Sequence, residues 1–228
     1  MSFTVDFEWA VDEAGYTWVP EEPADESDEK SAFGEILSAL YGKPIRPARI
    51  VRRGGKLRPN RPFERVNGLF LPFSKSATTA EGLVEFINRH GPMTREGNEA
   101  SGEDAIIGIG HAQSISEFLR NYRLDRHSCF ATFGEQGLGW SRVDIGLAFN
   151  LRTGQPQMKL KPSSLVNALW FEIAASLTGD APLRACRHCG EWFQTGPGTT
   201  RRLDATFCSN DHRVAFNSLK RRRRDRVS

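Results

Sequence analysis

Four side chains near the C-terminal end have the types and the spacing of a metal site. They are three of the four cysteines and one histidine, Cys186, Cys189, Cys208 and His212. A Cys-x-x-Cys knuckle lets two thiolates reach one ion, and residues four positions apart share one face of a helix. Zn²⁺ in structural sites prefers four such ligands in a closed tetrahedron. The sequence therefore predicts one structural zinc ion at these residues.

Other interpretations of these residues stay open. The cysteines could be reduced residues of a core, or Cys186 and Cys189 could form a disulfide, although the lack of a secretory segment argues against oxidation. His188 is an alternative fourth ligand, but inside the knuckle it would crowd the two thiolates. Cys129 lies far from the others and is interpreted as a small buried hydrophobe.

The elements that position these ligands are predicted from local signals. Glycine and proline at 196–198 favour a reversal, which indicates a short hairpin after the knuckle. Ser209 and Asp211 favour a helix start, because their side chains can accept hydrogen bonds from free backbone N–H groups. We expect a helix from about Ser209 to Arg224. The finger then covers residues 184–226 and follows an α+β body over residues 1–180.

The same stretch resembles a known group of bacterial zinc fingers. Residues 165–224 carry Cys-x-x-Cys-Gly-x-Trp-Phe, then Phe-Cys-Ser-x-x-x-Arg and a basic helix. This pattern resembles the C-terminal finger of bacterial proteins related to the CGNR zinc-finger group, and residues 69–91 resemble a segment found ahead of such fingers. The resemblance implies a treble-clef-like finger and a role in transcription regulation. His212 stands where many relatives have a cysteine, and only Arg213 remains of the Gly-Asn-Arg that names the group.

Charge is strongly segregated along the chain although the net charge is only +3. Residues 1–43 carry a net −9, whereas residues 44–65 and 184–228 each carry +7. This distribution predicts an acidic front and two basic regions that could meet a polyanion. The first basic region, residues 44–65, is called the basic arm here. It could touch phosphates, but we favour a loop or ribbon whose arginines pair with the acidic front.

The first functional hypothesis is binding of DNA or RNA by the finger. Its helix would present basic side chains to phosphates, and two arginines before the helix would flank the same site: Arg213, Lys220, Arg221, Arg222, Arg223 and Arg224, with Arg201 and Arg202. Such binding weakens steeply with salt. An arginine run by itself predicts contact with the nucleic-acid backbone and no reading of sequence. The alternative is a helix end whose basic residues suit the helix dipole.

The second hypothesis is a zinc-stapled module that binds a protein or a small ligand. The acidic front could then bind a basic partner or associate with the arginine segments of another copy. Trp192 and Phe193 serve either as the core of the finger, which we favour, or as a contact surface. The sequence shows no nucleophile motif, phosphate loop or helical His-Glu-x-x-His, so no enzyme is indicated. A Cys₃His shell has no open position for water, so we expect the metal to be structural.

The body is predicted from periodicity to be α+β, with antiparallel hairpins, which could contribute to one sheet, packed with three or four helices. Alternation predicts a hairpin of residues 3–11 with 16–19 and a second hairpin around residues 143–160. A mobile acidic loop is expected at 20–30, a buried strand at 69–73 and polar loop at 93–104. Helices are expected at 33–40, after a capping box at 78–81, at 111–122 and at 163–178.

The sequence also bears on location. It contains no apolar run near 18 residues and no basic-then-apolar start. We therefore expect a cytoplasmic protein that does not enter a membrane.

Overall fold

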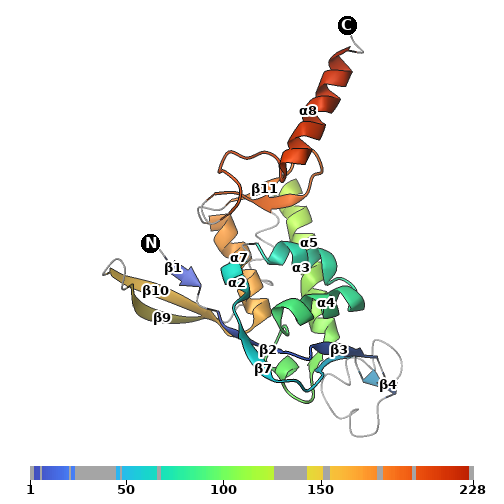
Figure 1. Ribbon diagram of the computed structural model, residues 1–228, viewed down its shortest axis with the longest axis vertical. Coiled ribbons are helices and arrows are strands. Elements are labelled where there is room, and N and C mark those ends of the chain that lie inside the picture. The colour runs from blue at the N-terminus through green and yellow to red at the C-terminus, as the bar shows by residue number, and fades with distance from the viewer. Residues whose placement is uncertain are drawn as a thin grey trace.

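The computed structural model describes residues 3–5, 7–20, 22–23, 45–46, 48–65, 68–125, 143–150, 155–178, 182–196 and 199–225. Over these residues the protein combines helices with mostly antiparallel strands, which confirms the α+β class (Figure 1). The described strands form five small sheets, so the expectation that the hairpins share one antiparallel sheet is wrong. No helix in the described ranges combines the length and the apolar character needed to cross a membrane.

The N-terminal segment forms short strands with separate partners. β1 (Phe3–Val5) runs parallel to β10 (Gln155–Pro162), β2 (Trp9–Asp12) pairs with β7 (Leu57–Asn60), and β3 (Tyr16–Val19) pairs with β6 (Arg49–Arg52). The predicted hairpin of residues 3–11 with 16–19 is therefore wrong, although the turn between them forms. Alternation identifies a strand but not its partner, and here the basic arm supplies the partner of both β2 and β3.

The basic arm also pairs with the acidic front through its side chains. The fully buried Asp12 carboxylate lies 2.9 Å from Arg52 Nε, and Arg61 lies 2.8 Å from Glu8. Asp12 also accepts hydrogen bonds from three backbone N–H groups of the adjacent turns. Burial opposes ionisation of Asp12, but these donors and Arg52 hold the pKa of its carboxyl below the ordinary value. The favoured interpretation of the arm, a ribbon paired with the acidic front, is confirmed at these residues.

Three further short strands complete the sheets around the arm. β4 (Glu22–Pro23) pairs with β5 (Ile45–Arg46), and β8 (Glu103–Asp104) pairs with the free edge of β6. The polar stretch 93–104, predicted as loop, thus contains β8 and the 3₁₀ turn η1 (Glu96–Asn98). Apart from Pro20 and β4, the acidic loop predicted at 20–30 lies outside the described residues, and so does the helix predicted at 33–40.

A helical core covers these sheets. It contains α2 (Pro62–Arg65), α3 (Phe70–Ser76), α4 (Ala80–His90), α5 (Ala105–Leu124) and α7 (Leu165–Thr178). α3 contacts α4, α5 and α7. The strand predicted at 69–73 is wrong, because these residues begin α3. Leu69, Phe70 and Phe73 are fully buried at helical spacing, and a short apolar run does not distinguish a helix from a strand.

Helix α4 begins one residue later than the capping box predicts. Thr79, rather than Thr78, is the N-cap, and its hydroxyl accepts a hydrogen bond from the Gly82 N–H at 3.2 Å. The predicted apolar face is confirmed, since its residues Leu83, Phe86 and Ile87 are buried. Gly91 ends the helix with φ 101°, a conformation that favours glycine. Helix α4 therefore ends at His90, immediately before this glycine.

Most of the remaining predictions for the body are confirmed, but the helix predicted at 111–122 begins earlier, as α5 starts at Ala105, and the described body holds five helices rather than three or four. β9 (Val143–Asn150) and β10 form the second hairpin, with Gln155 opposite Asn150. α7 buries Val166, Trp170 and Ile173 as its spacing predicts. Trp170 Nε1 donates to His111 Nδ1 at 3.2 Å, and burial lowers the pKa of His111, so this half-buried histidine acts as a neutral hydrogen-bond acceptor in a structural role. Cys129 lies outside the described residues.

Candidate metal centre

A short antiparallel hairpin holds the first two ligands. β11 (Leu183–Ala185) and β12 (Trp192–Gln194) flank the knuckle that carries Cys186 and Cys189. The knuckle closes because Gly190 N–H donates to Cys186 O at 2.8 Å, with Gly190 in the left-handed region at φ 77°. Pro197 and Gly198 of the hairpin predicted at 196–198 lie outside the described residues, but the chain does turn there, since Thr199 N–H donates to Gly196 O at 3.1 Å. Gly196 N–H bonds to Arg201 O at 2.8 Å in the loop that leads to the next ligand.

The N-terminus of α8 (Asn210–Asp225) positions the other two ligands. Ser209 caps this helix, because its hydroxyl accepts a hydrogen bond from His212 N–H at 3.0 Å. The cap places Cys208 just before the helix and His212 in its first turn, so both side chains point to one side. The predicted start at Ser209 is confirmed as the cap, and the predicted end agrees within one residue.

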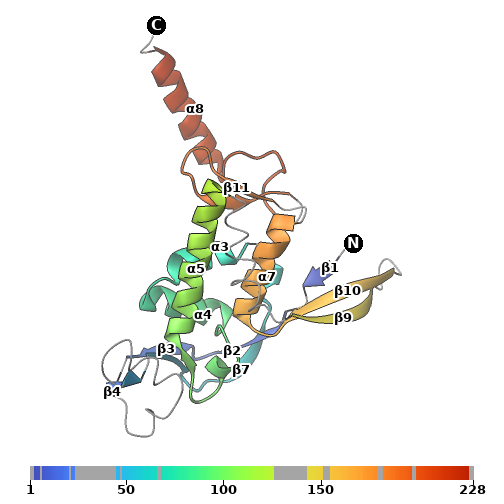
Figure 2. The same ribbon diagram turned by 180° about the vertical axis from the view of Figure 1, so that it is seen from behind.

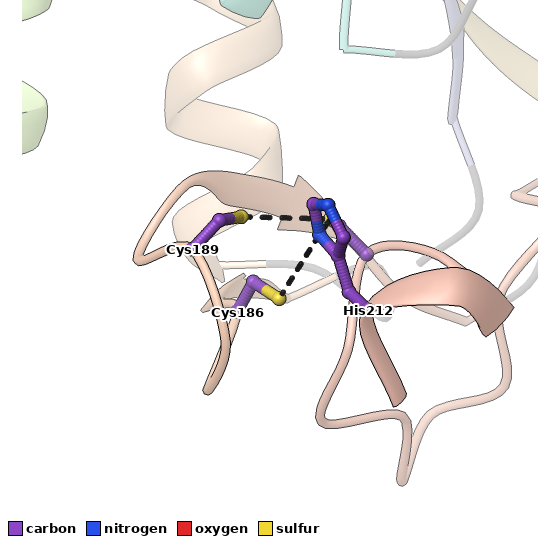
Figure 3. Close-up of side chains that lie close together, drawn as sticks. Cys186, Cys189 and His212 are labelled. Carbon is purple, nitrogen blue, oxygen red and sulfur yellow. Dashed lines mark hydrogen bonds between the residues drawn. The ribbon is translucent and has the colours of Figure 1, made fainter. Parts of the chain in front are cut away.

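The four ligand atoms converge on one point. Cys189 Sγ and Cys208 Sγ are 3.8 Å apart, and His212 Nδ1 lies 3.8 Å from Cys186 Sγ and 3.0 Å from Cys208 Sγ. All four side chains offer ligand atoms within 4.8 Å of one another. Figure 3 shows the side chains of Cys186 and Cys189 directed toward His212. This group could hold a metal ion.

The three thiols influence one another's ionisation. Burial opposes ionisation of Cys186, but backbone N–H groups of Cys189, Cys208 and His188, with the imidazole of His212, lower its pKa to about 6. Burial, hydrogen bonds to the other two sulfurs and their negative charge raise the pKa of Cys208 to about 12. Three thiolates this close therefore need a cation between them.

His188 does not join the cluster. It is exposed, and its ring packs against that of His212 with 4.9 Å between centroids. The fourth member of the group that could hold a metal is thus His212 rather than His188. Cys186, Cys189 and Cys208 form no disulfide.

Of the aromatic pair beside the knuckle, Phe193 fits the favoured interpretation as a core residue, whereas Trp192 packs against the body and fits neither interpretation. Phe193 is buried, whereas Trp192 is half-buried and its Nε1 donates to Leu119 O of α5 at 3.1 Å. The Trp192 ring also packs on Tyr122. Lys75 of α3 pairs with Glu191 at the end of the knuckle. Trp192 and Glu191 therefore fix the hairpin to the helical body.

The predicted basic residues occupy two places. Arg201 and Arg202 lie in the loop before α8, where Arg202 pairs with Asp204 at 3.4 Å. Arg213, Lys220, Arg221 and Arg222 are exposed on α8, and the backbone of Arg223 and Arg224 continues the helix. Among the described residues, Lys220, Arg221 and Arg222 contact no carboxylate within 4 Å. In both views α8 projects away from the body (Figures 1 and 2).

Sequence reasoning missed several residues around the centre. Asn210 holds Arg213 through its Oδ1, at 3.1 Å from Nε and 2.8 Å from Nη2, and the i, i+3 spacing on a helix could have indicated this pair. The contact of Lys75 with Glu191 carries no sequence signal, because the two residues are far apart in the chain. The contact of Trp192 with α5 also has no sequence signal, because nothing in its local sequence indicates α5 as its neighbour.

Comparison of the chain with protein-family models, with curated proteins and with solved structures finds no match. The function is therefore inferred from the site.

Proposed function

We propose that Cys186, Cys189, Cys208 and His212 hold one structural Zn²⁺, and that residues 184–226 form the treble-clef-like finger that the sequence resembles. The observation that carries this proposal is the spacing of the ligand atoms. With Zn–S near 2.3 Å and Zn–N near 2.0 Å, tetrahedral ligands lie about 3.8 Å apart for two sulfurs and about 3.5 Å apart for sulfur and nitrogen. The 3.8 Å separations of Cys189 from Cys208 and of Cys186 from His212 are close to these edges, whereas Cys208 and His212, 3.0 Å apart, would move apart by about 0.5 Å around an ion.

The donor set favours zinc over harder cations. Thiolate and imidazole ligands suit zinc, whereas Mg²⁺ and Ca²⁺ take oxygen ligands. Four protein ligands fill a tetrahedral shell and exclude the water that a catalytic zinc activates. Reduced thiols also suit a reducing compartment such as the cytoplasm. We therefore assign the ion a structural role in a cytoplasmic protein.

The finger has little else to hold it together. Between the knuckle and the end of α8, few described side chains are buried, among them Cys186, Phe193 and Thr195. Segments of this size that cannot bury a sufficient core depend on metal binding for folding. Loss of the ion should therefore unfold α8 while the helical body remains.

We propose further that the finger binds nucleic acid through phosphate contacts. The support is the exposed set Lys220, Arg221 and Arg222, which projects from the body on α8 and pairs with no described carboxylate. Phosphates would supply the missing anions and release their own counterions. Arg201, Arg202 and Arg213 add positive charge near the start of the helix. This arrangement supports the regulator-like role that the resemblance implies.

The metal site is tested by zinc content per chain. Cys186→Ser and Cys208→Ser should each lose zinc and the hydrogen-exchange protection of α8, because three ligands no longer close the shell. Cys129→Ser is the matched control and should keep one zinc. Retention of one zinc per chain in both ligand variants would contradict the site.

The nucleic-acid role is tested separately on the zinc-loaded chain. Binding to mixed-sequence duplex DNA and to single-stranded RNA should be measured at two salt concentrations. We expect binding that weakens steeply with salt. Absence of binding at low salt would contradict the nucleic-acid role. The alternative, a zinc-stapled module that binds a protein or a small ligand, would then remain.

A further inference from the structure

We infer that one face of α8 enters the major groove of duplex DNA and reads base edges there. The inference rests on the proposed nucleic-acid role and goes beyond the phosphate contacts. This face, called the outward face, points away from the metal centre. It consists of Asn210, Arg213, Val214, Asn217 and Arg221.

The position of the metal centre fixes which face points outward. His212 faces the ligands, Ala215 and Phe216 are half-buried, and the Phe216 ring packs on Phe207 with 5.3 Å between centroids. Because an α-helix turns once every 3.6 residues, the outward face lies on the opposite side. Its five side chains are exposed, with Val214 at 52%. Metal binding would therefore present this face rather than cover it.

The diameter of α8 favours duplex DNA over duplex RNA as the nucleic acid that it binds. A helix with its side chains is about 10–12 Å across, which matches the roughly 12 Å width of the major groove of B-form DNA. The major groove of A-form RNA is too deep and narrow for side chains to read. α8 projects from the body, and residues 217–222 are exposed on every side (Figure 2). The projecting part of α8 can thus enter a groove without a clash from the body.

The side chains of the outward face have the chemistry of base recognition. Arginine donates two hydrogen bonds to guanine, asparagine pairs with adenine, and small apolar groups contact the thymine methyl. Arg213 is held in place by Asn210 before any ligand arrives. Val214 is an exposed apolar side chain among polar neighbours, which a thymine methyl would cover. We assign guanine contact to Arg213 and adenine contact to Asn217.

Two cations flank this face. Helical spacing puts Lys220 and Arg222 on opposite sides of the outward face, roughly a quarter turn or more from its centre. Both are exposed. A helix lying in the major groove has a phosphate backbone on each side, so these cations would each contact one strand. Phosphate contacts would then set the position of the helix, and the outward face would supply the specificity.

The first experiment tests whether filling the major groove of the DNA weakens binding. The full zinc-loaded chain is titrated with three duplexes of one mixed sequence: unmodified DNA, DNA with glucosylated 5-hydroxymethylcytosine, which fills the major groove, and RNA. We expect at least about tenfold weaker binding to the glucosylated DNA and to the RNA. Equal affinity for all three would overturn groove entry while leaving phosphate binding intact. No binding to any of them at low salt would instead contradict the proposed nucleic-acid function.

The second experiment measures which base sequences the chain prefers. The chain and two variants select duplexes from a random-sequence library. The wild-type chain should enrich a short motif, and Asn217→Ala should lose preference at one position by about 5- to 150-fold. Lys220→Ala should weaken binding to all sequences alike. Both substitutions are at exposed helix positions, so the fold should persist. An unchanged motif with Asn217→Ala, or no motif for the wild type, would overturn base reading.

Discussion

The two basic regions carry equal net charge but use it differently. In the basic arm, Arg52 of β6 binds Asp12, and Arg61, directly after β7, binds Glu8 of the acidic front. On α8, the exposed cations extend away from the body and pair with no described carboxylate. Part of the charge of the arm is thus neutralised inside the fold and stabilises it, whereas Arg53, Lys56 and Arg58 stay exposed on the body. The exposed cations of α8 lie on a helix that projects from the body, and we expect an external polyanion to contact these rather than those of the arm.

The largest expected effect of a single substitution lies where the acidic front contacts the arm. Asp12→Ala would leave Arg52 and three backbone N–H groups without their acceptor. Because Arg52 is 22% exposed and water can solvate part of its charge, we expect a loss of about 3 kcal/mol in the free energy of unfolding. Denaturant titration measures it, with Asp104→Ala as the control for the more exposed Arg49 pair. A loss below about 1 kcal/mol would show that the arm is not held by this pair.

The lowered pKa of Asp12 predicts that the stability of the fold decreases in acid. The folded-state pKa of Asp12 is lowered from its ordinary 3.8, so its contribution is present above that value and decreases as the pH falls below it. Unfolding midpoints from about pH 5 to about pH 3 should fall less steeply in Asp12→Ala than in the wild type. Parallel curves would argue that Asp12 is not ionised in the fold.

A matched pair of triple variants compares the regions directly. The α8 variant loses three exposed cations through the substitutions Lys220→Ala, Arg221→Ala and Arg222→Ala. The arm variant loses three exposed cations through the substitutions Arg53→Ala, Lys56→Ala and Arg58→Ala. We expect the α8 variant to bind duplex DNA at least about tenfold more weakly and to lose about one unit of salt slope per cation. The arm variant should bind like the wild type. Equal losses in both would show that net charge alone governs binding.

The smallest effect is expected at the edge of the arm. Arg61 and Glu8 are about half exposed and form a surface pair. Arg61→Ala should cost less than about 1 kcal/mol in the free energy of unfolding, because solvent screens such pairs. Thermal unfolding beside the Asp12 variant would rank the two contacts. An effect as large as that of Asp12→Ala would contradict the ranking.

The metal centre could be predicted because its information is local. Two ligands lie in a knuckle, and the other two are separated by one helical turn whose cap, Ser209, is adjacent to Cys208. The pairing of β11 with β12 around the knuckle was not predicted, because glycine and proline at 196–198 mark a turn without identifying which strands pair.

The body was predicted less well where distant segments decide the structure. The alternating residues 3–11 fit a strand, but their partners are β10 and β7, which no local pattern specifies. Leu69 to Phe73 is too short for its periodicity to separate helix from strand. The outward face of α8 does not follow from the run of basic residues, because the side of the helix that points outward depends on where the metal centre lies.

The central claim is that a metal ion folds the finger that carries the unpaired cations of α8. The most direct measurement is duplex DNA binding by the full chain before and after zinc chelation, at low and high salt. The account predicts salt-sensitive binding that is lost on chelation and restored by Zn²⁺ but not by Mg²⁺. Unchanged affinity after complete removal of zinc would contradict it.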